Sequence, residues 1–161
     1  MIRHVKAEDL DRLAQIEADS YPKAEAASRE SIKKRMESFP ECFWILEEDG
    51  IIKSFINGMA TDEEDLTDIM YDDASMHKKD GEWQMIFSVV TEKPYRGQGL
   101  ANQVMNKVIE DCRDRGRKGI VLTCKDGLRL FYAEFGYEDE GVSQSNHGDT
   151  IWYKMRMTLK T

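Results

Sequence analysis

The spacing of apolar residues predicts alternating helices and strands along the chain. Between Gln98 and Arg115 apolar side chains recur in an i, i+1, i+4, i+5 pattern. That pattern is typical of an amphipathic helix, and Gly116 is placed to end it. Trp83–Thr91 and Gly119–Cys124 are rich in β-branched and aromatic residues, so we expect two buried strands there.

Shorter patterns predict the other elements. Two apolar runs, Cys42–Leu46 and Ile51–Met59, flank Glu48-Asp49-Gly50 and indicate a hairpin. Ser28 is a candidate N-cap for a helix over Arg29–Ser38. The further expected elements are a strand at Ile2–Lys6, a helix from Ala7, a short helix at Leu128–Phe135, and strands near Tyr137–Val142 and Thr150–Leu159. Residues 60–82 lack a clear period, and we expect a loop there.

The order of these elements predicts an α/β (α+β) fold with a central mixed sheet and helices on both faces. The 161 residues suit one domain spanning 1–161, because the sequence offers no linker composition. No apolar run approaches the roughly 20 residues of a membrane span. The N-terminus lacks a signal-peptide pattern, so we expect a cytoplasmic protein without a membrane partner.

The net charge of −8 argues against a nucleic-acid-coating protein, which needs a basic face. The charge is uneven: residues 92–125 hold eight Lys/Arg against four Asp/Glu, whereas residues 60–82 hold nine acids and two lysines. Three cysteines without CxxC spacing predict neither a disulfide framework nor a cysteine-rich zinc site, and we expect no metal.

The segment most informative about chemistry joins the strand Trp83–Thr91 to the long helix through a turn with Gly97 and Gly99. Exposed backbone N–H groups at a helix start favour phosphate, and glycine lets a phosphate approach closely. A Walker A pattern is absent, and Asn102 stands where a dinucleotide-binding GxGxxG motif has its third glycine. An ordinary strand-turn-helix crossover stays open as an alternative.

Arg96–Ala101 (RGQGLA) resembles the [RQ]xxGx[GA] pyrophosphate-binding motif of the GNAT superfamily of N-acetyltransferases. The segment with Phe131-Tyr132 and then Phe135-Gly136-Tyr137 resembles the superfamily's closing block. The element order is similar to the whole GNAT fold. Within the superfamily, the closing block and the hairpin look most like the arylalkylamine (serotonin-type) N-acetyltransferases and their bacterial relatives.

The resemblance implies that acetyl-CoA lies in a V-shaped opening between the strands Trp83–Thr91 and Gly119–Cys124. A backbone N–H at or near Val89 would stabilise the oxyanion of the tetrahedral intermediate. The residues implied in binding acetyl-CoA are Val89, Val90, Thr91, Arg96, Gly97, Gln98, Gly99, Leu100, Ala101 and Asn102, with added charge from Lys93.

Tyr132 stands at the position of the family's general acid. A phenol is still protonated at neutral pH and can donate its proton to the leaving thiolate. The alternative is that Tyr132 only packs beside Phe131. The histidines that animal arylalkylamine enzymes carry on the fourth strand have no counterpart here; Met85 and Phe87 stand at their positions. Glu82 is a candidate base acting through water, or a solvated acid at a strand end.

The resemblance implies direct acetyl transfer to a small primary amine. Within the arylalkylamine subgroup, it implies an amine that carries an aromatic ring. Two alternatives are acetylation of a protein N-terminus or lysine, and a catalytically silent acyl-CoA-binding module. Trp44, Trp83 and Phe87 either line an aromatic pocket or fill the core. Residues 60–82 either attract a cationic amine as a lid or form a solvated loop. Cys124 is expected to be a buried apolar residue rather than a nucleophile. A homodimer is compatible with the family.

Overall fold

The computed structural model describes residues 1–145 and 147–159, and within them the strands form two sheets. The first is antiparallel, in the order β1-β2-β3-β6. Its strands are β1 (Ile2–Arg3), β2 (Phe43–Glu48), β3 (Ile51–Asn57) and β6 (Ser88–Thr91). The second has the order β4-β5-β7-β9-β8, and its β5–β7 pair is parallel. Its strands are β4 (Ala60–Thr61), β5 (Trp83–Met85), β7 (Gly119–Cys124), β9 (Tyr153–Thr158) and β8 (Glu138–Val142).

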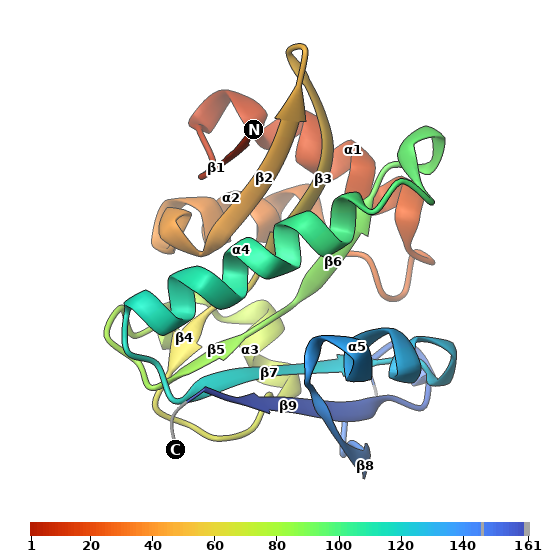
Figure 1. The fold of residues 1–161 in the computed structure, drawn as a ribbon. Helices are drawn as coiled ribbons and strands as arrows, with labels where there is room; N and C mark the ends of the chain where they lie inside the picture. The colour runs from red at the N-terminus through yellow and green to blue at the C-terminus, as the bar shows by residue number, and fades with distance from the viewer. Residues whose placement is uncertain (146, 160–161) are drawn as a thin grey trace.

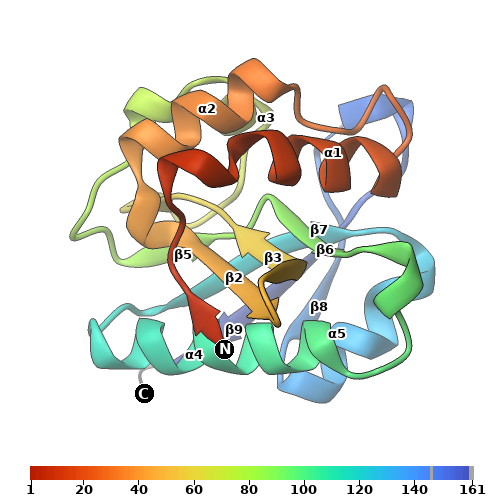
Figure 2. The ribbon, with the colours of Figure 1, turned by 90° about the horizontal axis from the view of Figure 1, so that it is seen from above.

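Five α-helices in the described part of the chain cover the sheets. They are α1 (Leu10–Ser20), α2 (Arg29–Ser38), α3 (Asp68–Asp72), α4 (Leu100–Asp114) and α5 (Arg129–Phe135). Seen from above, α1 and α2 lie on one side of the strands, and α4 and α5 lie on the other (Figure 2). The predicted α/β class with helices on both faces is therefore confirmed, but the strands of the described residues form two sheets rather than one central sheet.

Local sequence signals explain where several elements begin. The Ser28 hydroxyl accepts a hydrogen bond from the Ser31 N–H at 3.1 Å and caps α2, as predicted. The hairpin turns at Asp49 and Gly50, both with positive φ. The long helix buries the predicted apolar stripe, but it begins at Leu100 rather than Gln98, because Gly99 has a left-handed φ of 76°.

The predicted strand Trp83–Thr91 is interrupted, and the interruption opens the molecule. The Ile86 N–H donates to the Val121 carbonyl of β7 at 3.0 Å, whereas the next N–H, of Phe87, donates to the Asn57 carbonyl of β3 at 2.7 Å. The chain thus changes partner strand between two residues. Beyond this point β6 follows β3 and diverges from β7 (Figure 1).

Residues 60–82 are not the continuous loop that the sequence predicted. They contain β4, α3 and a 3-10 turn at Ala74–Met76. Leu66 and Met70 are buried in the core and anchor the segment. Elements of two to five residues are too short to show a period in sequence, which explains the difference. Among the described residues, no helix is long and apolar enough to span a membrane.

Candidate active site

A cavity of about 680 Å³ occupies the opening between β6 and β7. Its walls come from α1, the α1–α2 connection, α2, α3, the two diverging strands, the residues after β7, α5 and the segment around His147. This volume lies within the usual range of ligand pockets. The strand divergence therefore creates a site large enough for a small molecule together with one end of a cosubstrate.

The edge of β6 forms one wall of the cavity, and Val89, Val90 and Thr91 line it as expected. Its backbone groups at Val89 already have a partner, which the sequence did not indicate. The Tyr21 hydroxyl donates to the Val89 carbonyl at 3.1 Å and accepts from the Val89 N–H at 3.3 Å. A ligand that pairs with this strand edge must displace the Tyr21 hydroxyl.

The glycine turn lies next to the cavity, at the start of α4. Arg96 lines the cavity, and its Nε donates to the Thr91 carbonyl at 2.8 Å. Gly97 and Gly99 have φ of 79° and 76°, and a Cβ on either would meet no atom within 4 Å. The N–H groups in the first turn of a helix have no intrahelical partner. This open, N–H-rich turn fits the pyrophosphate of a CoA thioester.

Tyr132 reaches the cavity from α5. It is 5% exposed and packs edge-to-face against Phe131 and Tyr137, with ring centroids 5.0 and 5.8 Å away. Burial raises the pKa of its phenol well above the ordinary value. The phenol is therefore held protonated, as a donor to a leaving thiolate must be. Packing and lining the cavity occur together, so the two alternatives for Tyr132 do not exclude each other.

The inner end of the cavity holds the predicted aromatic candidate Phe87 together with four residues that were not predicted to form the site. Tyr71 stacks on His147 with centroids 4.8 Å apart and contacts the Phe87 ring at 4.8 Å. The Arg35 guanidinium lies 4.6 Å from the centre of the Phe87 ring. Glu17 completes this end, and all five residues line the cavity. This end of the cavity therefore combines an aromatic wall with two buried charges.

A sequence signal for the two buried charges exists. Glu17 follows Leu13 and Ile16 at helical spacing, and Arg35 stands between Ile32 and Met36 in the same way. Both charged residues thus interrupt apolar helix faces, and both are buried, at 2% and 3% exposure. A charged residue in an apolar stripe is rare unless it is paired or functional. The contacts of Tyr71 and His147 depend on the tertiary fold and leave no such signal.

Other sequence candidates lie outside the cavity or serve in packing. Glu82 is about half exposed, and its carboxylate pairs with the Lys118 ammonium at 2.7 Å. It does not line the cavity with Tyr132. Trp44 and Trp83 are buried in the core, so only Phe87 of the three proposed aromatics lines the cavity.

Cys124 lines the cavity but is 3% exposed. Burial raises the pKa of its thiol to about 11. A thiol that stays protonated at neutral pH is a poor nucleophile. This favours the expected packing role.

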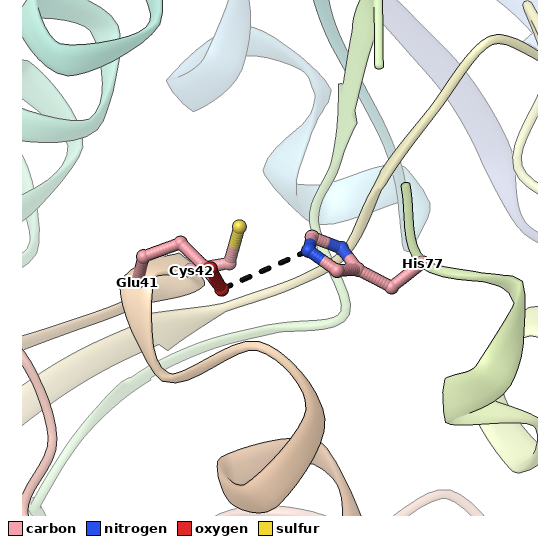
Figure 3. A group of neighbouring side chains, drawn as sticks. All are labelled: Glu41, Cys42 and His77. Atoms are coloured by element: carbon pink, nitrogen blue, oxygen red, sulfur yellow. Dashed lines mark ion pairs between the residues drawn. The ribbon is translucent and has the colours of Figure 1, made fainter. Parts of the chain in front are cut away.

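Glu41, Cys42 and His77 form a separate cluster whose ligand atoms lie within 4.8 Å of one another (Figure 3). Nε2 of His77 lies 3.7 Å from Oε1 of Glu41. The Ala60 N–H donates to Nδ1 of His77 at 3.1 Å, which leaves the proton of the neutral ring on Nε2. Burial also raises the pKa of the Cys42 thiol to about 12. Because metal ligands must be deprotonated, the protons on His77 Nε2 and on the Cys42 thiol would both have to leave before an ion could bind here.

Comparison with solved structures defines the fold. The GphF GNAT-like decarboxylase in complex with isobutyryl-CoA superposes with a TM-score of 0.85 at 18% identity, covering 99% of this chain and 100% of that one. The ribosomal-protein-S18-alanine N-acetyltransferase from Escherichia coli gives a TM-score of 0.74 at 14% identity, covering 100% and 94%. The architecture is therefore the GNAT fold.

The sequence places the chain within that fold. The family model described as "Acetyltransferase (GNAT) family" matches residues 10–137, and the chain belongs to this family of N-acetyltransferases. A curated relative, the probable glucosamine 6-phosphate N-acetyltransferase 2 of Oryza sativa subsp. japonica, is 32% identical over 57 residues. That match covers 35% of this chain and 34% of the relative, so the chain spans about a third of the relative's length.

Proposed function

We propose that the protein transfers the acetyl group of acetyl-CoA directly to the nitrogen of a small primary amine. The observation that carries this proposal is the cavity between β6 and β7, which brings together the edge of β6, Arg96 and Tyr132. The glycine turn adds room and N–H groups for the CoA pyrophosphate. The proposed oxyanion donor on β6, the proposed acid and a cation for the cosubstrate therefore line one opening.

The proposed reaction needs an oxyanion donor and an acid. The Val89 N–H is the donor, once the thioester carbonyl replaces the Tyr21 hydroxyl on it. The amine nitrogen attacks the thioester carbon, and the C–S bond breaks as the tetrahedral intermediate collapses. Tyr132 donates its proton to the departing thiolate and is reprotonated by the proton that the nitrogen loses as the amide forms. Residues Val89 to Thr91, Arg96 and the turn Gly97–Asn102 hold the cosubstrate in this proposal.

The walls of the cavity support a small acceptor. Phe87, Tyr71 and His147 form a continuous aromatic surface at its inner end. Such a surface suits an alkyl amine that carries an aromatic ring, as the arylalkylamine resemblance implies. The glucosamine 6-phosphate N-acetyltransferases among the relatives add amino sugar phosphates to the amines worth testing. A peptide needs an open groove, which makes a protein acceptor the less favoured alternative.

The test is release of CoA from acetyl-CoA with a panel of acceptors: tryptamine, glucosamine 6-phosphate and a peptide with a free N-terminus. We expect turnover with at least one small amine and less with the peptide. Selective turnover of the peptide would favour the protein acetyltransferase. Acetyl-CoA binding without turnover of any acceptor would favour the silent acyl-CoA-binding module.

A further inference from the structure

Glu17 is a buried carboxylate on α1 with an incomplete set of partners. It is 2% exposed, lines the cavity and forms no ion pair within the described part of the chain. Its Oε2 accepts a hydrogen bond from the Ala27 N–H at 3.0 Å. Among the described residues its Oε1 has no partner that meets hydrogen-bond geometry, although the Ser88 side chain is near enough to lower the pKa of the carboxyl by hydrogen bonding. A buried carboxylate oxygen without a donor is costly, so a donor from a bound ligand would be strongly favoured there.

The charged groups around Glu17 stabilise it without completing its hydrogen bonds. Arg35, from α2, is the cation with the largest electrostatic effect on Glu17, but its Nη1 donates to Asn57 Oδ1 at 3.2 Å and its Nη2 to the Tyr71 carbonyl at 3.0 Å. Other titratable groups act on this region: His147, the hydroxyls of Tyr21, Tyr71 and Tyr132, and the carboxylates of Asp68 and Asp72. The Arg35 charge therefore supports an ionised carboxylate while Oε1 stays available.

Glu17 is also close to the reacting end of the proposed cosubstrate. The Ser88 side chain interacts favourably with its carboxylate, and Ser88 directly precedes Val89 on β6. Tyr132 lines the same cavity from α5. An amine held at Glu17 therefore lies within the chamber that contains both the oxyanion donor and the proposed acid.

We infer that Glu17 is the subsite for the ammonium group of the acceptor and the base that takes its first proton, which makes the acceptor an aliphatic amine that arrives protonated. This inference rests on the proposed acetyl transfer. The R–NH3⁺ group gives one proton to Glu17, and the freed lone pair forms the C–N bond. The second proton leaves the nitrogen as the thiolate is protonated through Tyr132. Glu17 then releases its proton to solvent with the products.

Burial acts on Glu17 in the direction that a base requires. Desolvation raises the pKa of its carboxyl, while the Ala27 N–H, Ser88 and Arg35 oppose the rise. A base whose pKa moves towards the working pH accepts a proton more readily in the transition state. Weakly basic amines, such as alkoxyamines, are neutral at pH 7.5 and need no such base.

The experiment compares Glu17→Gln with a matched control on the same helix, Asp19→Asn, which changes an exposed acid. CoA release is measured with an aliphatic amine, phenethylamine, and with a weakly basic one, O-benzylhydroxylamine. We expect Glu17→Gln to lower kcat/KM for phenethylamine about 100-fold, and for O-benzylhydroxylamine less than about threefold. The loss for phenethylamine should shrink as pH rises, because more of the amine is then already neutral.

Equal losses for both amines, or full activity of Glu17→Gln, would overturn the inference. Calorimetry with CoA checks that the variant keeps its cosubstrate affinity, and Glu17→Asp replaces it if Glu17→Gln does not fold. Failure of the proposed acetyl transfer looks different, because the wild type then turns over neither amine. In that case phenethylamine binding to the CoA complex is the readout: loss of binding in Glu17→Gln supports the subsite, and unchanged binding overturns it.

Discussion

At the scale of single residues, the site depends on burial that sets the protonation of each group. Tyr132 is held as a neutral phenol, and the pKa of Cys124 is raised to about 11. Burial also raises the pKa of the Glu17 carboxyl, which makes its carboxylate a better proton acceptor. One apolar chamber thus keeps two acids protonated and makes one carboxylate more basic, which is a division of roles suited to acyl transfer.

Tyr132→Phe removes only the phenolic proton donor. We expect kcat to fall about 10²- to 10⁴-fold, the usual contribution of a general acid. The melting temperature should change little, because the ring contacts with Phe131 and Tyr137 are retained. Steady-state kinetics and thermal unfolding measure the two effects, and near-normal turnover would contradict the acid role.

The residue scale also shows where sequence reasoning succeeded and failed. Tyr132 and the edge Val89–Thr91 line the cavity because their places follow from a strand and a short helix that the sequence specifies well. Tyr21, Tyr71 and His147 meet there only because three connections fold over the opening. Connections without a period carry no sequence signal for such contacts. Glu17 and Arg35 were predictable from their apolar helix faces.

At the scale of elements, the change of partner strand at Ile86 and Phe87 creates the site. The sequence predicted one uninterrupted strand over Trp83–Thr91, since its apolar pattern continues through the break. The strand is interrupted because Ile86 pairs with β7 whereas Phe87 pairs with β3. Such pairing depends on residues that are far away in sequence. Gly58 is part of that arrangement, because a Cβ there would stand 1.7 Å from the Met85 carbonyl oxygen.

Gly58→Ala tests the close backbone approach that supports the break. The clash involves backbone atoms that cannot rotate away, so we expect a loss of about 2 kcal/mol or more in the free energy of unfolding. Gly127→Ala is the control, because a Cβ at Gly127 meets nothing within 4 Å and its φ is not left-handed. Denaturant unfolding compares the two, and equal stabilities would contradict the packing described for Gly58.

Tyr21→Phe tests the competition for the edge of β6. The variant leaves the Val89 N–H and carbonyl without their hydroxyl partner. A cosubstrate that pairs with Val89 then displaces no protein hydrogen bond, so its dissociation constant should fall about 3- to 10-fold. Isothermal calorimetry with CoA and acetyl-CoA measures this change. Weaker binding of both ligands would show that Tyr21 supports the cosubstrate instead.

At the scale of the whole molecule, the charge separation seen in the sequence has a structural counterpart. The locally basic stretch 92–125 runs from the end of β6 through the glycine turn and α4 to the end of β7. It therefore borders the side of the opening proposed for the anionic cosubstrate. The acidic stretch 60–82 contributes Tyr71 and Asp72 to the acceptor side. The distribution matches an anionic donor and a cationic acceptor, although the net charge is −8.

Acetyl-CoA should stabilise the molecule as a whole, because it would bridge the two diverging sheets. At 100 times its dissociation constant a ligand of the folded state adds about 2.7 kcal/mol. For a chain of this size that corresponds to about 5–10 °C in melting temperature. A thermal shift titration measures the effect. Arg96→Gln should reduce the shift at a fixed ligand concentration, whereas an unchanged shift would place the pyrophosphate elsewhere.

The most direct measurement of the proposed acetyl transfer site is a crystal structure of the protein with acetyl-CoA. We expect the pantetheine arm between β6 and β7, with the thioester carbonyl on the Val89 N–H and the Tyr21 hydroxyl displaced from it. The sulfur should lie beside the Tyr132 hydroxyl, and the carbonyl carbon should face the chamber that contains Glu17. A thioester bound outside this opening, or turned away from Tyr132, would contradict the proposed site and its chemistry.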